Sequence, residues 1–342
     1  MTTHRTPHDA PAIEATGLTR TFRAKNATVT AVDGLDLTVR TGEMVAFLGP
    51  NGAGKSTTLR MLTTLLPPTS GAARIGGFDV AREGRRVRGV IGYVGQGNGA
   101  GHWHHGRDEL VGQARAHGMT TAQARARVDE LTDALELDGV LDRKVATLSG
   151  GQRRRLDVAL GLMHAPDVLF LDEPSTGLDP QNRANMQEQI RRMHRDSGAT
   201  VVLTTHYLEE ADALAERVVV IDHGRVIADD SARALKSGLG DRVTLDVASG
   251  DAPAVAARLA ALAGHAPERS RDGRTLHARV PDGRAHVARL LADLAADGIV
   301  ADGVTVVAPT LDDVFLSLTG RSLRDGARAA SGSSPRLEEV AA

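Results

Sequence analysis

The chain contains no cysteine in its 342 residues. This absence excludes disulfide bonds, thiolate metal ligands and cysteine nucleophiles, and it agrees with a reducing compartment. No run approaches the roughly 18 consecutive apolar residues of a membrane-spanning helix, so we do not expect the chain to cross a bilayer. Lysine is also rare, at Lys25, Lys55, Lys144 and Lys236. A GC-rich bacterial genome accounts for this scarcity, which has no functional meaning by itself.

An excess of charge of either sign is also lacking. The chain has 41 basic and 43 acidic residues, a net charge of −2 and a pI near 6.7, which gives no electrostatic case for coating nucleic acid. Apolar residues make up 41% and charged residues 25%, the balance of a soluble globular protein, and the length predicts about two domains. The polar start of the sequence predicts no signal peptide.

Continuous apolar runs in the first two thirds of the chain predict strands that are buried on both faces of a sheet. Helical patterns separate some of these runs, so we expect an α/β domain with a mostly parallel sheet. The runs are MVAFL at 44–48, VLFL at 168–171, VVL at 201–203 and VVVI at 218–221. Shorter runs between Ile13 and Val39, with the alternating LDLTV at 35–39, indicate an additional antiparallel β part.

The remaining segments predict a helical insertion and a second domain. Between about 97 and 165 the pattern is mostly helical, with Val128, Leu131 and Leu135 on one helix face. After Gly240, strand and helix patterns alternate, which predicts a small α+β domain. We therefore expect a flexible leader, a main domain that contains the insertion, the small domain and a disordered tail. Their predicted bounds are 1–11, 12–240, 241–322 and 323–342.

A glycine-rich loop follows the first apolar run directly, in the sequence GPNGAGKS from Gly49 to Ser56. It matches G-x-x-x-x-G-K-[ST], in which glycines let successive backbone N–H groups face phosphates. Lys55 would reach the β- and γ-phosphates of a nucleotide, and Ser56 would bind Mg²⁺. The alternative is a glycine-rich turn with an incidental lysine, but the position after a buried strand and before a helical pattern favours the phosphate loop.

A pair of carboxylates, Asp172 and Glu173, ends the predicted strand in VLFLDEP. Acidic residues at such positions hold Mg²⁺ in phosphoryl-transfer sites, and we expect Asp172 to do so through water. Glu173 follows it and is placed to polarise an attacking water as general base. The alternative is an ordinary solvated acidic pair, which the presence of Lys55 makes the weaker interpretation.

A second glycine pair opens an amphipathic pattern in LSGGQRRRLDVAL, residues 148–160. Leu156, Ala159, Leu160 and Met163 recur at helical spacing, with three arginines on the other side. Backbone amides at a helix start suit a phosphate. A simple helix N-cap by Ser149 is compatible with that role.

The ordered set GPNGAGKS, LSGGQ, LDEP, STGLDP and TTH resembles the ATP-binding subunit of an ATP-binding cassette (ABC) protein over residues of about 13–235. The resemblance implies a P-loop NTPase core with a mostly parallel sheet, an antiparallel β subdomain and a helical insertion. It also implies that two copies pack head to tail, so that the signature motif of one chain covers the γ-phosphate on the other. Ser149 and the Gly151 amide would then be neutral donors that supplement a site already holding Lys55 and Mg²⁺.

Individual roles also follow from this resemblance. Gln96 matches the Q-loop that contacts Mg²⁺ or water, His206 the switch histidine that orients the water with Glu173, and Asp179 the D-loop aspartate at the dimer interface. Phe22 occupies the place of the aromatic side chain that stacks on adenine. The resemblance implies nucleotide contacts by Gly49, Pro50, Asn51, Gly52, Ala53, Gly54, Lys55, Ser56, Thr57, Phe22, Ser149, Gly150, Gly151, Gln152 and Asp179. It implies metal contacts by Ser56, Gln96 and Asp172 and catalytic roles for Glu173, His206 and Gln96.

The chain departs from the family just after Gln96, where His102, Trp103, His104 and His105 replace an acidic stretch rich in Leu and Thr. The H-x-H-H spacing permits a metal interpretation, but no carboxylate or cysteine in the pattern completes such a site. We favour a contact with a membrane partner, anchored by an exposed Trp103.

The C-terminal PTLDDVFLSLTGR at 309–321, together with the small second domain, resembles ATPase subunits of type-two ABC exporters of the daunorubicin-resistance kind. This resemblance implies ATP hydrolysis that powers a separate permease at the cytoplasmic face of a bacterial membrane. It further implies a second copy as partner, export of a hydrophobic compound such as an antibiotic, and no nucleic-acid partner. The alternatives are a soluble ABC ATPase of translation or DNA maintenance, and a non-catalytic nucleotide-regulated binding module.

Overall fold

The structure is a computed structural model that describes residues 11–24, 27–97 and 99–320. The predicted leader, apart from Pro11, and the predicted tail lie outside the described residues. Pro11 is the first residue of strand β1 rather than part of a leader. The described chain forms two compact units that meet in sequence between Asp229 and Asp230. This division precedes the boundary expected after residue 240, because α8 (Ala232–Ser237) packs on α11 (Leu311–Thr319) of the second unit.

The first unit contains a six-stranded sheet whose order is β10-β9-β3-β8-β7-β6. The pairs β6–β7, β7–β8, β8–β3 and β3–β9 are parallel, as the continuous apolar runs predict. Every residue of β3, β7 and β8 is buried. The strands are β3 (Met44–Leu48), β6 (Ile91–Val94), β7 (Val168–Asp172), β8 (Thr200–Thr205), β9 (Arg217–Asp222) and β10 (Arg225–Asp230).

A second sheet of this unit has the order β2-β1-β4-β5 and is antiparallel. Its strands are β1 (Pro11–Ala24), β2 (Ala27–Arg40), β4 (Ser70–Ile75) and β5 (Phe78–Asp79). Helix α1 (Lys55–Leu62) contacts strands of both sheets, and one apolar core joins them, with Ile13, Leu35, Phe47 and Phe170 fully or almost fully buried. In the sequence the helical pattern continues to Leu66, but helix α1 ends at Leu62. Thr64 turns the chain there with a φ of 64°, ahead of two prolines.

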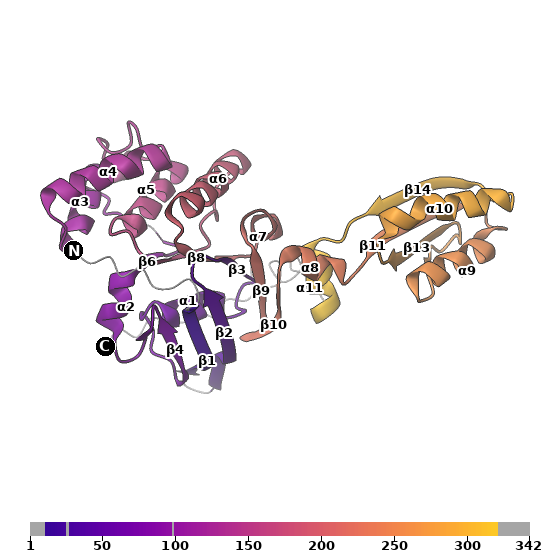
Figure 1. Ribbon diagram of the computed structural model, residues 1–342, viewed down its shortest axis with the longest axis horizontal. Helices are drawn as coiled ribbons and strands as arrows, with labels where there is room; N and C mark the ends of the chain where they lie inside the picture. The colour runs from indigo at the N-terminus through magenta and orange to yellow at the C-terminus, as the bar shows by residue number, and fades with distance from the viewer. Residues whose placement is uncertain (1–10, 25–26, 98, 321–342) are drawn as a thin grey trace. The chain divides into compact units, whose positions relative to one another are not determined.

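The helices of the first unit lie mainly on the side of the six-stranded sheet away from the antiparallel strands (Figure 1). The predicted insertion is helical, and α4 is closed at its start by a capping box of Thr120 and Gln123. The helices are α2 (Gly84–Val90), α3 (Gly106–Ala116), α4 (Thr121–Leu135), α5 (Gly150–Leu162), α6 (Pro180–Ser197) and α7 (Leu208–Leu214), with a short 3₁₀ turn η1 (Val145–Thr147).

The second unit has the predicted alternation of strands and helices, with one additional short strand, β12. Its antiparallel sheet has the order β12-β13-β11-β14, the β-α-β-β-α-β arrangement of ferredoxin-like folds. Val243, Leu245 and Leu276 of the sheet form a core with Leu259 and Leu294 of the two helices. The elements are β11 (Asp241–Val247), α9 (Ala252–Ala263), β12 (Glu268–Arg269), β13 (Thr275–Val280), α10 (Gly283–Ala296) and β14 (Ala301–Val307). In neither unit is any helix among the described residues long and apolar enough to cross a membrane.

Candidate active site

The glycine-rich loop lies between β3 and α1, and the start of α1 has no side-chain cap. Gly54, at the N-cap, has a φ of 104°, and a Cβ built there would lie 2.4 Å from the carbonyl oxygen of Ala31. Only glycine fits this position without strain. An uncapped helix start with a glycine turn in front of it presents backbone N–H groups and the positive end of the helix dipole to an anion.

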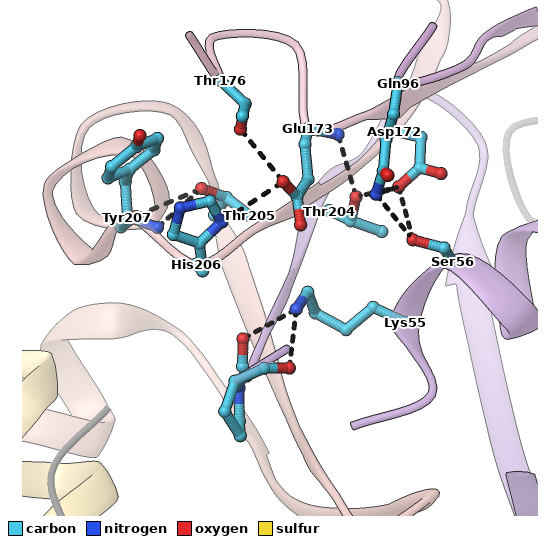
Figure 2. A network of polar contacts seen from close by, with 12 residues as sticks. Lys55, Ser56, Gln96, Asp172, Glu173, Thr176, Thr204, Thr205, His206 and Tyr207 are labelled. Atoms are coloured by element: carbon cyan, nitrogen blue, oxygen red, sulfur yellow. Dashed lines mark hydrogen bonds and ion pairs between the residues drawn. The ribbon is translucent and has the colours of Figure 1, made fainter. Parts of the chain in front are cut away.

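Lys55 is buried, and its ammonium lies on the loop itself. Nζ donates to the carbonyl oxygens of Gly49 at 2.7 Å and Pro50 at 3.0 Å. Burial lowers the pKa of Lys55, while the carboxylates of Glu173 and Asp172 act in the opposite direction. The structure therefore places the positive charge of the phosphate loop next to both predicted acidic residues (Figure 2).

Asp172 ends β7 and is 1% exposed. Its Oδ1 accepts hydrogen bonds from Ser56 Oγ at 2.9 Å and Thr204 Oγ1 at 2.7 Å. Gln96 follows β6, and its Nε2 donates to Ser56 Oγ at 3.0 Å and to Asp172 Oδ1 at 3.4 Å. The three predicted metal-binding residues thus meet in one polar cluster, although they come from separate segments of the chain (Figure 2).

Glu173 has a φ of 50°, a left-handed conformation that costs on the order of 1–3 kcal/mol in a non-glycine residue. Its backbone N–H donates to Thr204 at Oγ1, 3.0 Å away, and at the carbonyl oxygen, 3.2 Å away. Its Oε2 accepts from Thr176 Oγ1 at 3.0 Å and lies 3.3 Å from His206 Nδ1. The structure therefore brings Glu173 and His206, two of the three predicted catalytic residues, into direct contact.

The charge state of Glu173 results from opposing influences. Burial raises the pKa of this carboxyl, but His206, Lys55 and Thr176 together lower it below its ordinary value. Glu173 is therefore an ionised carboxylate near neutral pH. Such a group orients and polarises a water molecule, although a low pKa limits how far it removes a proton by itself.

The signature segment forms the start of α5, and there it differs from the phosphate loop. Ser149 Oγ accepts from the Gln152 N–H at 3.3 Å, and the Gln152 Oε1 accepts from the Ser149 N–H at 3.0 Å, which makes a capping box. Within the described ranges, the structure records no hydrogen bond between residues 149–152 and the phosphate loop. Within one chain, the two predicted phosphate sites are therefore not joined by a direct hydrogen bond among the described residues.

Asp179 caps α6 and is linked to the signature through Asn182. Its Oδ1 accepts from the Asn182 N–H at 2.9 Å and its Oδ2 from Asn182 Nδ2 at 2.6 Å, and these bonds lower the pKa of Asp179. A Cβ on Gly151 would lie 2.8 Å from Asn182 Oδ1. The second signature glycine therefore allows α5 to approach the start of α6 closely.

Phe22 lies on β1 and is 37% exposed. The guanidinium of Arg20 lies 4.8 Å from its ring centroid. This arrangement leaves part of the aromatic ring accessible for stacking, but no recorded contact connects it with the residues around Lys55.

Thr204 and Arg154 contact the cluster, and neither is in the predicted site. Thr204 could have been recognised as the first residue of the TTH motif, two positions before His206. Arg154 could not, because it is the middle of three arginines assigned to the polar side of a helix. That assignment is wrong for Arg154, which is only 8% exposed.

The histidine loop after Gln96 is close to carboxylates that its spacing does not reveal. His104 Nδ1 lies 2.6 Å from Glu109 Oε1, and His105 Nδ1 lies 3.6 Å from Asp108 Oδ2. No three histidine, aspartate or glutamate side chains converge among the described residues, so the metal interpretation gains no support. Trp103 is 81% exposed, as a contact residue should be.

The fold and the clustered residues are those of a P-loop ATPase cassette. Residues 32–176 match the ABC transporter family. The chain is 45% identical over 316 residues, 92% of its length and 94% of the relative, to a daunorubicin/doxorubicin resistance ATP-binding protein of Streptomyces peucetius. It is 41% identical to a Nod factor export ATP-binding protein of Paraburkholderia xenovorans, over 86% of this chain and 94% of that protein.

A solved structure also matches: a dimeric post-hydrolysis state of an ATP-binding cassette with ADP and phosphate. It is 25% identical, has a TM-score of 0.60, and the match covers 64% of this chain and 98% of the cassette. The chain belongs to the ABC transporter ATP-binding subunits of the daunorubicin/doxorubicin-resistance type. It binds and hydrolyses ATP and powers an exporter. The alternative of an ATPase in translation or DNA maintenance is not favoured by these relatives.

Proposed function

We propose that two copies of the chain associate head to tail and share two ATP–Mg²⁺ sites. In each site, Lys55, Ser56 and Glu173 come from one chain and Ser149 and Gly151 from the other. The observation that supports this proposal is that no hydrogen bond joins the two helix starts within one chain over the described ranges. The similar cassette solved as a dimer with ADP and phosphate gives it further support.

The residues around Asp172 fit a magnesium ion. Mg²⁺ prefers oxygen ligands, and Ser56 Oγ and Asp172 Oδ1 supply two such oxygens 2.9 Å apart, with the Gln96 side-chain amide beside them. The nearby Lys55 ammonium adds positive charge against the phosphates. When bound, the ion would neutralise charge that develops on the phosphate oxygens during transfer.

The remaining steps depend on the side chains themselves. Lys55 and the loop amides hold the β- and γ-phosphates, and the start of α5 on the other chain covers the γ-phosphate with neutral donors. Glu173 accepts a hydrogen bond from the attacking water, and His206, 3.3 Å from that carboxylate, orients it. Catalysis is then mainly positioning and electrostatic stabilisation.

The partner of the dimer is a separate membrane permease, which places the chain at the cytoplasmic face of a bacterial membrane. Relatives are named for resistance to daunorubicin, doxorubicin and linearmycin, which favours export of a hydrophobic antibiotic. The exposed Trp103 loop would form part of the permease contact. Trp103→Ala should weaken co-purification with the permease and leave ATP hydrolysis by the chain alone intact; unchanged assembly and transport would reject this contact.

A mixing experiment tests the shared sites. A Lys55→Ala chain and a Ser149→Arg chain each form only defective homodimers, whereas their mixed dimer contains one intact site and one doubly defective site. Random mixing should restore about a quarter of the wild-type ATPase rate, because half of the dimers carry one of two sites. ATP-dependent dimerisation should return in parallel. If neither the mixture nor the wild-type chain dimerises with ATP, the shared-site proposal is wrong.

A further inference from the structure

Arg154 is a buried cation on the helix that begins with the signature motif. It lies one turn after Ser149 on α5, and its guanidinium points into the end of the parallel sheet instead of into solvent. Nε donates to the carbonyl oxygen of Pro174 at 2.8 Å. Nη2 donates to the carbonyl oxygens of Asp172 at 3.1 Å and Glu173 at 3.3 Å. One side chain therefore contacts three consecutive peptide groups around Glu173.

These bonds act on a strained part of the backbone. Glu173 is in the left-handed region, which persists in a non-glycine residue only when the surroundings impose it. Thr204 fixes the N–H side of Glu173, and Arg154 fixes the carbonyl side of the same residue and of both neighbours. The direction of the Glu173 carboxylate toward His206 depends on this turn.

The same helix also holds the segment that contains Gln96. Arg154 Nη1 donates to the carbonyl oxygen of Gly95 at 2.6 Å. One turn further along α5, Asp157 Oδ1 accepts from the N–H groups of Gly99 at 3.0 Å and Ala100 at 3.1 Å. Gln96 is therefore held on both sides from α5, while its own amide donates to Ser56 and Asp172.

An arginine is required for this arrangement. Its planar fork places donors in several fixed directions, and all three nitrogens are used here, whereas a lysine has one compact ammonium group. Burial lowers the pKa of Arg154, and the nearby carboxylates of Asp157, Asp172 and Glu210 oppose this effect by favouring the charged form. An apolar side chain of similar length, such as methionine, would donate to none of the four carbonyl oxygens.

We propose that Arg154, together with Asp157, is a positioning residue by which the signature helix sets the orientation of Glu173 and Gln96 in the chain's own ATP site. This inference rests on the proposed function, because the start of α5 serves the site of the other chain. Movement of α5 when Ser149 meets the partner's nucleotide is transmitted through Arg154 to the catalytic turn of its own chain. The two ATP sites of the dimer are thereby mechanically linked.

The test compares Arg154→Met, Arg154→Lys and the control Arg127→Met in the full chain. Arg127 is a suitable control because its guanidinium also donates to a backbone carbonyl, that of Leu162 at 2.9 Å, but away from the catalytic turn. We expect Arg154→Met to lower kcat by about 100-fold with KM for ATP changed less than about threefold. Arg154→Lys should recover about tenfold of this loss, because it retains the charge and one donor group. Arg127→Met should keep kcat within about twofold.

A mixed dimer separates positioning from a general effect on folding. In the dimer of a Lys55→Ala chain with a Ser149→Arg chain, the intact site uses Glu173 of the Ser149→Arg chain. Arg154→Met should abolish activity when placed in that chain and have little effect in the Lys55→Ala chain. Equal losses from either chain, or a loss matched by Arg127→Met, would overturn the inference.

A second pair of variants controls for a loss of folding in Arg154→Met. If Arg154→Met does not fold by circular dichroism, Asp157→Ala and the matched Asp157→Asn replace it, since asparagine retains the accepting oxygen. We expect Asp157→Ala to lower kcat and Asp157→Asn to restore it; equal kcat values overturn the inference. A wild-type chain that neither hydrolyses ATP nor dimerises would instead reject the proposed function. If the wild-type chain is active and Arg154→Met has the same kcat, only this inference is rejected.

Discussion

The two helix starts of this chain that we predict to bind phosphate are built in opposite ways. The start of α1 has a left-handed glycine, no side-chain cap and a buried lysine beside it. The start of α5 is closed by Ser149 and Gln152 in a capping box. The first is thus arranged for an anion within its own chain, at the expense of an uncapped helix end. The second is stable by itself, and its neutral donors suit the face of a nucleotide that another chain already binds.

The largest effect is expected from stopping the chemistry while both helix starts remain intact. Glu173→Gln removes the carboxylate that polarises water, so kcat should fall by about a thousandfold. ATP binding should persist and a closed dimer should accumulate, visible by size-exclusion chromatography with ATP. The control is Glu188→Gln, an exposed residue on α6, which should behave as the wild type. Wild-type turnover in Glu173→Gln would refute the base assignment.

The glycines at the two helix starts should respond unequally to the same substitution. Gly54→Ala places a Cβ 2.4 Å from the Ala31 carbonyl at a φ of 104°, and should lower the free energy of unfolding by about 2 kcal/mol. A Cβ on Gly150 meets no atom within 4 Å. Gly150→Ala should therefore leave the stability of the chain without nucleotide unchanged. Thermal unfolding of both variants measures the difference, and equal losses would contradict it.

The cap of α5 should have two functions, stabilising its helix and supporting dimerisation, of which the matched cap of α4 has only the first. Ser149→Ala should lower the free energy of unfolding by about 1 kcal/mol through loss of the N-cap. It should also weaken ATP-dependent dimerisation by roughly fivefold, the equivalent of one lost neutral hydrogen bond. Thr120→Ala removes the corresponding capping box of α4. It should cost similar stability with no effect on dimerisation, and a dimerisation defect there would show that the cap acts only through folding.

The smallest effect is expected from a substitution near the C-terminal end of α5. His164, just after this helix, stacks on His117 with centroids 3.8 Å apart, and burial lowers the pKa of both rings. Below the ordinary pKa of about 6.5 the unfolded chain therefore binds more protons, so stability is present above that pH and is lost below it. His117→Phe keeps an aromatic ring in the stack and removes one titrating group. The difference between the melting temperatures at pH 7.5 and pH 5.5 should be smaller in this variant than in the wild type, by on the order of 1 °C. The same difference in both proteins would exclude the histidine pair as a source of the pH dependence.

Much of the fold could be predicted because its patterns are local. The buried strands β3, β7, β8 and β9, the helical insertion and the strand–helix alternation after Gly240 all follow from apolar periodicity. The residues around Lys55 and Asp172 could be identified because their motifs have fixed spacing in sequence. The strand β12 could not, because two residues are too few to show an apolar period, although its partner β13 follows directly in sequence. The early division at Asp229 could not either, since it depends on the contact of α8 with α11, far along the chain.

Part of the candidate site followed from comparison with a family and not from the residues by themselves. Gln96 and His206 have no local pattern that distinguishes them from surface residues. Thr204, which bonds both Asp172 and the Glu173 backbone, was absent from the expected set. Its role depends on β7 and β8 being neighbours in the sheet, which no short stretch of sequence specifies.

The sequence by itself determined the phosphate loop, the acidic pair and two helix starts, because glycine conformation, capping and strand–loop–helix order are properties of neighbouring residues. Only the tertiary structure decided which of these groups meet. It joins Ser56, Gln96 and Asp172 in one cluster, to which no hydrogen bond links residues 149–152 in the described part of the chain. It also buries one of three consecutive arginines, Arg154, against the backbone turn at Glu173. The physical reason is that burial and pairing depend on which distant segments pack together, and identical neighbours in sequence can face entirely different surroundings.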